Sequence, residues 1–302
     1  MKASVIIPTF NKYERLKLTL HTLELQTYDK KCFEVIIIND GSTDETNQLI
    51  SDNIFNFDLH YLNQTNKGRA AARNAGIKAA KNEILIFIDD DTVLDKDFIR
   101  AHIEKQQDNK SIIHGMIREV PYVKFFKDPS KGIFYDEFVQ LGVNTKNLNQ
   151  MCITTEELEF KFAEKIEAKS KITAHEKIVQ AVFEYGAVKW NWITFSGGNM
   201  SLPKKWAEKS GCFDEKYYVN WGCEDMDLGY RLMERGYPFR YCKEAVNYHL
   251  DHFRKNFSQE HDKNMRLFYK KYKNSDFLLF QEFVEGKRKA NDIIDMIVKS
   301  VH

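Results

Sequence analysis

Five consecutive apolar residues that run directly into three aspartates constrain the fold of this chain more than any other feature. Residues Ile84–Ile88 contain no polar side chain and are rich in β-branched types, which is typical of a strand buried on both faces of a sheet. Asp89, Asp90 and Asp91 follow at the carboxyl end of this strand, where open α/β sheets bind ligands. Adjacent carboxylates repel one another unless a cation compensates them, and such hard oxygen ligands suit Mg²⁺ or Mn²⁺. Taken alone, the run fits an acidic turn before a helix equally well, so the neighbouring segments must decide.

The first 120 residues alternate short apolar segments with amphipathic ones. The apolar segments predict strands over residues 4–8, 35–38, 58–62, 84–88 and 111–117, and the amphipathic ones predict helices over 13–25, 69–81 and 97–107, with another that reaches residue 50. This alternation predicts a parallel sheet whose strands are joined by right-handed crossovers. Because the polar clusters follow the strands, we expect them to lie together on one edge of the sheet.

The rhythm changes after Pro121. Residues 121–190 contain charged helical segments, which we interpret as an insertion or lid. The elements predicted beyond Pro121 are helices over 155–169 and 173–185, regular structure over 190–202, helices from residue 204 and over 224–235, a strand over 245–249, and helices over 258–272 and 275–301. We therefore divide the chain into residues 1–120, 121–190, 191–255 and 256–302.

Length, charge and cysteine usage narrow the class of protein. The 302 residues can bury a full core, and a net charge of +1 gives no field that would attract nucleic acid. The five cysteines are odd in number and form no C-x-x-C pair, which is typical of reduced thiols in a cytoplasmic protein. No apolar run approaches membrane-spanning length, and the first strand begins too early to leave room for a signal peptide. Any contact with a membrane is therefore expected to be peripheral.

Four short motifs in the first 120 residues together resemble those of inverting glycosyltransferases of family 2. They are Ser-Val-Ile-Ile-Pro-Thr-Phe-Asn at 4–11, Asn-Asp-Gly-Ser-Thr-Asp at 39–44, Asn-Lys-Gly with the following helix at 66–76, and the aspartates at 89–91. Later runs at 196–199 and 221–225 are similar to acceptor-side motifs of the same group and of galactosyltransferases, although Cys223 stands where the family usually has glycine. The resemblance implies the GT-A fold, an α/β architecture with a Rossmann-like, mostly parallel central sheet flanked by helices. Residues 1–120 would bind the nucleotide-sugar, and residues 191–255 would bind the acceptor and carry out catalysis.

The resemblance also implies that a UDP-sugar donor is bound by a set of polar residues and glycines. This set is Thr9, Asp40, Lys67, Arg69, Arg73, Asp89, Asp90, Gly198 and Asn199. Asp40 has an alternative role as the cap of a turn, and the last two residues of the set also fit an ordinary turn. Arg69 and Arg73 lie four apart on one helix face, so each has a surface ion pair as its alternative. Asp90, the middle aspartate, is expected to be solvated.

A metal site follows from the same resemblance. Asp91 would be the direct ligand of a Mn²⁺ or Mg²⁺ ion, which neutralises charge on the departing diphosphate. Because one carboxylate rarely holds such an ion alone, we expect a second ligand from a distant part of the chain. His249, at the end of a predicted strand, is that expected ligand, and His252 is its rival.

Inverting transfer needs a carboxylate that takes the proton from the incoming nucleophile. The resemblance assigns this base to Asp225, with Glu224 and Trp221 in contact with the acceptor. The helix dipole alone favours acidic residues at a helix start, and tryptophan is also a common core residue. The alternatives for these three residues are therefore structural.

We therefore expect a metal-dependent inverting transferase that moves a hexosyl or N-acetylhexosaminyl group from a UDP-sugar to a saccharide. A peptide Ser, Thr or Cys, or an aminoglycoside-type molecule, is the alternative acceptor. A sugar-1-phosphate nucleotidyltransferase would need a glycine- and arginine-rich loop at Thr9–Lys12, and a dinucleotide oxidoreductase would need G-x-G-x-x-G there. The rival outside these enzyme classes is a non-catalytic module that binds nucleotide-sugars. The last helix, with Ile293 and Ile297, could pack on the core, pair with a second copy or lie on a membrane.

Overall fold

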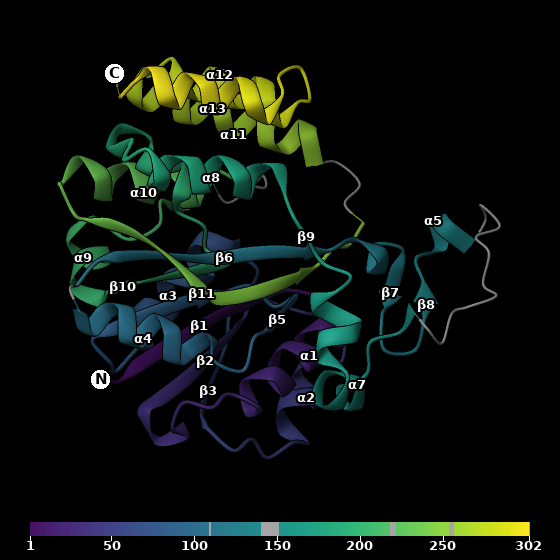
Figure 1. The fold of residues 1–302 in the computed structure, drawn as a ribbon. Helices are drawn as coiled ribbons and strands as arrows, with labels where there is room; N and C mark the ends of the chain where they lie inside the picture. The colour runs from purple at the N-terminus through teal and green to yellow at the C-terminus, as the bar shows by residue number, and fades with distance from the viewer. Residues whose placement is uncertain (109, 140–150, 218–221, 254–256, 302) are drawn as a thin grey trace.

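A single twisted sheet runs through the computed structural model of the chain, which describes residues 1–108, 110–139, 151–217, 222–253 and 257–301 (Figure 1). The sheet has nine strands in the order β3-β2-β1-β4-β10-β6-β11-β5, with β9 paired to β6. The strands are β1 (Ala3–Thr9), β2 (Phe33–Asn39), β3 (Asp58–Asn63), β4 (Ile84–Ile88), β5 (Thr92–Leu94), β6 (Ile112–Val120), β9 (Lys171–Ile172), β10 (Asn199–Pro203) and β11 (Phe239–Leu250). Strands β3, β2, β1 and β4 are parallel, as are β6 and β11, whereas β10 lies antiparallel between β4 and β6. The prediction of a mostly parallel α/β sheet is confirmed.

Helices cover both faces of this sheet. They are α1 (Tyr13–Glu24), α2 (Thr46–Ser51), α3 (Arg69–Ala79), α4 (Phe98–Asp108), α5 (Asp136–Val139), α7 (Thr155–Phe160), α8 (Ala174–Glu184), α9 (Lys204–Lys209), α10 (Glu224–Glu234), α11 (Phe257–Tyr272), α12 (Asp276–Val284) and α13 (Ala290–Lys299). Helices α1, α2 and α4 pack on one face, and α3, α9 and α10 pack on the other. Along β4, Ile84, Ile86 and Ile88 face the first group, whereas Leu85 and Phe87 face the second. Burial on both faces explains the unbroken apolar run.

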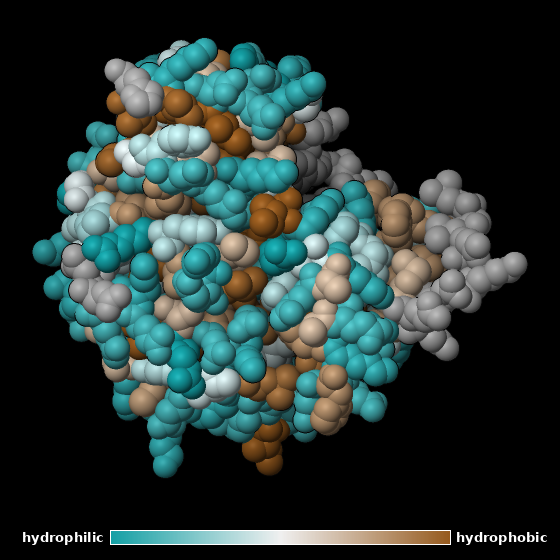
Figure 2. Space-filling model, in the orientation of Figure 1, coloured by the Kyte–Doolittle hydropathy of each residue, from teal (hydrophilic) through white to brown (hydrophobic). Residues whose placement is uncertain are grey.

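The C-terminal helices form a further layer on α8 and α10 (Figure 1). Figure 2 shows a largely hydrophilic face with hydrophobic atoms gathered along these helices. Ile293 and Ile297 are fully buried in a cluster with Trp190, Trp192 and Phe268, which confirms packing on the core. Among the described residues, no helix combines the length and the apolar character needed to cross a lipid bilayer.

The structure corrects several element predictions. Strand β5, directly after the aspartates, was not predicted, and the predicted strand at 245–249 is only the end of the longer β11. The helix predicted over 155–169 is instead α7 followed by a π-helical turn at Ala163–Glu167. The helix predicted over 275–301 is two helices, because the chain turns at Gly286, whose φ is +73°.

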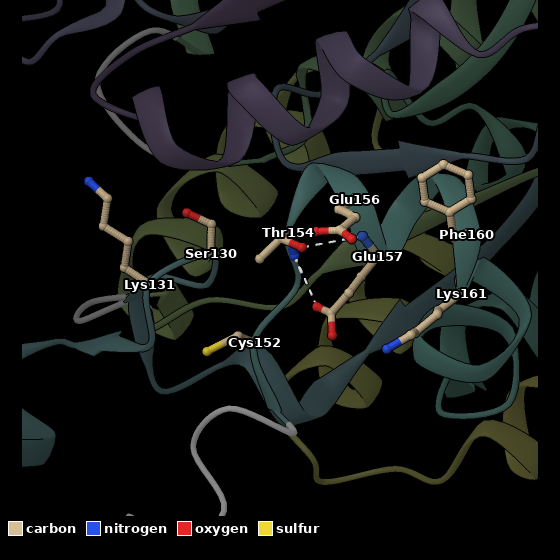
Figure 3. Close-up of a pocket in the computed structure, with 8 residues that line it drawn as sticks. All are labelled: Ser130, Lys131, Cys152, Thr154, Glu156, Glu157, Phe160 and Lys161. Carbon is tan, nitrogen blue, oxygen red and sulfur yellow. Dashed lines mark hydrogen bonds between the residues drawn. The ribbon is translucent and has the colours of Figure 1, made fainter.

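The segment 121–190, interpreted from sequence as an insertion, carries a small hairpin of β7 (Phe126–Asp128) and β8 (Ile133–Phe134), and a cavity of about 340 Å³ beside α7 (Figure 3). Thr154 and Glu157 line this cavity but bond to each other's backbone as a capping box that begins α7. Glu157 also pairs with the buried Lys165 at 2.5 Å. These polar groups are therefore engaged in holding the insertion together.

Candidate active site

Asp91 lies at the centre of a cluster of positively charged and imidazole groups. Its Oδ2 lies 3.2 Å from Lys12 Nζ and 3.1 Å from His252 Nε2, and its Oδ1 lies 3.5 Å from His249 Nε2. The carboxylate is only 4% exposed, and its Oδ1 accepts no hydrogen bond from the residues that the structure describes. Burial opposes ionisation, but Lys12 and His249 outweigh it and hold the pKa of Asp91 well below its ordinary value. Asp91 is therefore an anion with one oxygen still to be satisfied.

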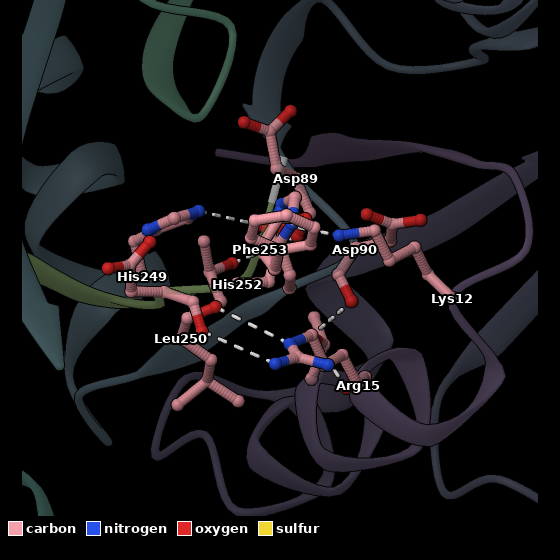
Figure 4. Close-up of polar contacts among 12 residues, drawn as sticks. Lys12, Arg15, Asp89, Asp90, His249, Leu250, His252 and Phe253 are labelled. Carbon is pink, nitrogen blue, oxygen red and sulfur yellow. Dashed lines mark hydrogen bonds and ion pairs between the residues drawn. The ribbon is translucent and has the colours of Figure 1, made fainter. Parts of the chain in front are cut away.

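The two histidines reach Asp91 because β11 pairs antiparallel with β5. His249 lies opposite Thr92 in this pair, and Leu250 N donates to Asp91 O at 2.8 Å. The end of β11 is held from below by Arg15, whose buried guanidinium donates to backbone carbonyls of β11 and of the insertion (Figure 4). The unpredicted strand β5 is thus what brings residues about 160 positions apart to one point.

A carboxylate and two imidazoles form a donor set that suits Mn²⁺ or Zn²⁺ and is acceptable to Mg²⁺. The nitrogen and oxygen atoms of Asp91, His249 and His252 all lie within 4.8 Å of one another. Together with the buried, unsatisfied Oδ1 of Asp91, this arrangement fits a divalent cation. Both His249 and His252 lie in the cluster, so both could bind the same ion and neither excludes the other.

Asp90 is more buried than we expected from the sequence. The prediction that this middle aspartate is solvated is wrong, since it is only 9% exposed. Burial and the neighbouring Asp91 raise the pKa of Asp90 to about 7. Thr9, which is expected to contact the donor, ends the adjacent β1, and its buried hydroxyl lies near Asp90 and opposes the rise of the pKa of that carboxyl.

Arg73 connects this edge of the sheet to helix α10. Its Nη2 lies 2.9 Å from Asp89 Oδ1, and its Nη1 lies 2.9 Å from Asp225 Oδ1 and 3.1 Å from Glu224 Oε1. The side chain is fully buried, and the three carboxylates outweigh the effect of burial and raise its pKa above the ordinary value for arginine. Arg69, one turn earlier, also reaches Glu224 at 3.4 Å and is about one third exposed. One guanidinium thus holds together acids from two distant parts of the chain.

The Asp225 carboxylate keeps access to solvent, with 23% of its side chain exposed. Partial burial raises its pKa to about 6, with Arg73 opposing this rise. The group is therefore ionised at neutral pH and close to the range expected of a general base. Gly198 lies against Asp89, the other carboxylate that pairs with Arg73, because a Cβ atom on this glycine would stand 2.8 Å from Asp89 Oδ2. A side chain at this position would therefore displace the Asp89 carboxylate.

Asp40 fixes the loop that begins α3. Its two oxygens accept hydrogen bonds from the backbone amides of Lys67 and Gly68 at 2.9 Å and from Gln64 Nε2 at 2.6 Å. This local role differs from the turn cap that the sequence offered as the alternative. The Lys67 side chain is exposed at the same edge.

Asn199 is the member of the predicted donor set that the structure does not bring to the cleft. Its fully buried amide bonds to Ala245 O, Asn247 Oδ1 and His102 Nε2 at 2.9 to 3.1 Å. Asn247 in turn donates to Gly198 O at 2.7 Å. Asn199 thus supports the loop at Gly198 from inside the sheet. Trp221, predicted to contact the acceptor, lies outside the described residues.

The turn before α10 has an unusual backbone. Gly222 and Cys223 both have left-handed φ values, +93° and +73°. Glycine adopts this left-handed conformation most readily. Cys223 has the backbone conformation that a glycine at this position would have, and the cysteine is strained in it. Helix α11 holds the turn, since Asn264 Nδ2 donates to Gly222 O at 2.8 Å and His261 packs on Gly222.

A cavity of about 400 Å³ opens beside Asp225. Asp89, Arg69 and Glu224 line it on the polar side, and side chains of α12 line it on the other. Asp225 therefore borders a cavity within the size range of sites for small organic ligands.

Sequence reasoning missed two residues of the site, Lys12 and Arg15. Lys12 follows the first motif, and Arg15 lies within an amphipathic helix, where a charged residue usually faces solvent. No spacing or motif distinguishes them, because their partners lie between 79 and 236 positions away.

Comparison with known proteins identifies the family. A model of the family "Glycosyl transferase family 2" matches residues 4–166, which is more than half of the chain, and a model of the "N-terminal domain of galactosyltransferase" matches residues 177–255. The chain belongs to glycosyltransferase family 2. Its sheet and flanking helices are those of the GT-A fold, as the resemblance of its motifs implied.

Individual relatives of this family-2 chain support the same conclusion. It is 30% identical to an uncharacterized glycosyltransferase, YfnE, of Bacillus subtilis, over 83% of the chain and 65% of that protein. It is 27% identical to chondroitin synthase of Escherichia coli, over 82% of the chain and 34% of that protein. The structure of S. aureus TarS 1-349 in complex with UDP-GlcNAc is similar, with a TM-score of 0.56, 18% identity, and coverage of 88% of this chain and 65% of that one. The chain thus spans two thirds or less of the length of these relatives.

Proposed function

We propose that this chain is a metal-dependent, inverting glycosyltransferase that moves a sugar from a UDP-sugar to a saccharide acceptor. The observation that carries the proposal is the bridge through Arg73, which holds Asp89 of the aspartate edge and Asp225 of α10 at 2.9 Å each. Asp89, which belongs to the edge expected to bind the donor, and Asp225, which could accept a proton from a nucleophile, therefore lie on either side of Arg73. The chondroitin synthase relative and the TarS complex with UDP-GlcNAc support a carbohydrate acceptor and a uridine nucleotide.

In this proposal, the chain's own residues bind and orient both substrates. Thr9, at the end of β1, contacts the nucleoside, and the Asp40-anchored loop presents Lys67 and Arg69 to the donor. Asp91, His249 and His252 are the residues that would hold the divalent cation. Such a cation, when bound, neutralises charge on the departing diphosphate.

Asp225 accepts the proton of the acceptor hydroxyl as its oxygen bonds to the anomeric carbon. The bond from this carbon to the UDP oxygen breaks on the opposite face, so the configuration inverts and UDP leaves with the electron pair. Arg73 keeps the Asp225 carboxylate ionised and aimed into the cleft. Residues 1–120 then serve the donor and residues 191–255 serve the acceptor.

The test is release of UDP from a panel of UDP-sugars, with GDP-mannose as a comparison, in Mn²⁺ or Mg²⁺ and with saccharide, peptide and aminoglycoside acceptors. We expect turnover of at least one UDP-sugar, its loss with EDTA, and a product of inverted anomeric configuration by NMR. An Asp225→Asn variant that binds UDP but does not turn over is the matched control. If the chain binds UDP-sugars yet transfers none of them with any metal, it is a binding module and the proposal is wrong.

A further inference from the structure

The cavity beside Asp225 has a wall that neither family model covers. The matches end at residue 255, whereas α12 begins at Asp276. Three residues of α12, namely Phe280, Phe283 and Val284, line the cavity opposite Glu224 and Asp225. Whatever occupies the cavity and reaches Asp225 must therefore also contact this helix.

The position of α12 relative to Asp225 is fixed by buried hydrogen bonds. His261 of α11 bonds through Nδ1 to Gln281 Oε1 of α12 at 2.8 Å. The same His261 packs on Gly222, since a Cβ atom on this glycine would lie 2.9 Å from its ring. Asn264, one turn further along α11, donates to Gly222 O at 2.8 Å. The turn before the catalytic helix and the wall formed by α12 are thus parts of one packed unit, and the cavity is formed before any ligand arrives.

The α12 side of the cavity carries no charge among the described residues. Besides the three α12 residues, it is bordered by Ile193, Phe195 and Met226. Two histidines also line it, and burial lowers the pKa of both, to about 4 for His175, so their rings are neutral at pH 7. A hydroxyl or charged group placed against Phe280, Phe283 and Val284 would lose its hydrogen bonds to water, whereas an apolar group would gain from leaving water.

We propose that the acceptor is a glycoside with an apolar aglycone, which α12 binds while a hydroxyl of the sugar faces Asp225. This inference rests on the proposed transfer to a saccharide and adds the chemical class of the acceptor. The cavity, at about 400 Å³, falls in the size range of sites for small organic ligands. An aryl metabolite and a lipid-linked sugar share this chemistry, and the test separates them by the shape of the aglycone.

The experiment measures equilibrium binding of matched glycosides by calorimetry, with UDP and Mn²⁺ present. The methyl, phenyl and octyl β-glycosides of glucose, galactose and N-acetylglucosamine differ only in aglycone and sugar. For at least one sugar, we expect the phenyl or octyl glycoside to bind about 10- to 100-fold more tightly than the methyl glycoside, as expected for burial of a side-chain-sized apolar group. A larger gain for phenyl indicates an aryl acceptor, and a larger gain for octyl indicates a lipid-linked one.

Variants of α12 test whether this helix is the binding wall. The aglycone gain is the ratio of the affinity for the phenyl or octyl glycoside to the affinity for the methyl glycoside. Phe283→Ala and Val284→Ser are expected to reduce this gain at least about fivefold, while UDP binding and thermal unfolding change little. Leu278→Ala removes an apolar side chain from the same helix that is 42% exposed and does not line the cavity, so it should retain the full gain.

The inference is overturned if no glycoside binds, if no pair differs by more than about threefold, or if the gain persists in both Phe283→Ala and Val284→Ser. Failure of the transfer reaction itself is a separate result, because glycoside binding is measured without turnover.

Discussion

Replacement of Arg73 by glutamine tests the link between the two halves of the site. The change removes a buried positive charge whose nitrogens lie 2.9 Å from Asp225 and from Asp89. A unit charge at about 4 Å contributes roughly 4 kcal/mol at an effective dielectric constant of about 20, and about 1.4 kcal/mol corresponds to one pKa unit. The loss of Arg73 should therefore raise the pKa of Asp225 from about 6 to a value between about 7 and 9.

The sign of the effect on activity follows from the state that a base needs. Asp225 accepts a proton only when it is ionised, so kcat/KM of the wild-type chain should fall as the pH decreases through about 6. In Arg73→Gln, the same acid limb should move to higher pH, so that activity at pH 7 drops about twofold if the new pKa is about 7 and about 90-fold if it is about 9, and it should partly return at pH 9. The assay is UDP release between pH 5 and pH 9, with one saccharide acceptor at subsaturating concentration.

Two controls separate this effect from a loss of folding. Arg69→Gln removes a charge that contacts Glu224 at 3.4 Å and is about one third exposed, so its acid limb should move much less. Arg73→Lys retains a charge but cannot span Asp89 and Asp225 together, so it should lie between the wild type and Arg73→Gln. Breaking a buried pair also costs about 3 to 5 kcal/mol of stability, which unfolding by urea will measure. A uniform loss of activity at every pH, with the acid limb unmoved, would refute the role given to Arg73.

Three further predictions concern single residues. Asp225→Asn should lower kcat by about 10² to 10⁴ while UDP binding, followed by calorimetry, stays within about threefold; retained turnover would remove the base from the mechanism. Mn²⁺ at about 100 times its Kd should stabilise the wild-type chain by about 2.7 kcal/mol, seen as a rise in Tm, and this rise should disappear in Asp91→Asn and shrink in His252→Ala. Cys223→Gly should stabilise the chain by about 1 kcal/mol, because glycine adopts φ +73° without strain; a lower Tm would show that packing of the thiol matters more.

Much of the fold could be predicted from sequence because its central strands are continuous apolar runs. In β4, alternate side chains enter two separate clusters on opposite faces, so every position is apolar and the strand is unmistakable. Strand β5 was not predicted because it has only three residues, Thr92–Leu94, and forms only by pairing with β11. The end of α12 just before Gly286 was also not predicted, although a glycine near the middle of a 27-residue helical pattern indicates that the helix can end there.

The candidate site was predictable only where a motif carries it. The aspartates at 89–91 and the acids at 224 and 225 stand out in the sequence, and the structure brings Asp89 together with Glu224 and Asp225 around Arg73. The role of Arg73 as the bridge depends on partners up to 152 positions away and could not be read from its helical spacing. Asn199 illustrates the opposite error, since a residue in a recognised motif is buried within the sheet and supports the site from there.

The late position of β10 in the sequence has a consequence for synthesis of the chain. This strand, residues 199–203, is inserted antiparallel between β4 and β6, so these two strands have no common neighbour until it is made. While a ribosome has delivered only the first 190 residues, the nascent chain holds the β3-β2-β1-β4 sheet with β4 unpaired on one side, and a β6 that lacks both of its long partners, β10 and β11. We expect this interval to be when the polypeptide most needs a chaperone, and a truncation before residue 199 to aggregate rather than to yield an isolated donor half.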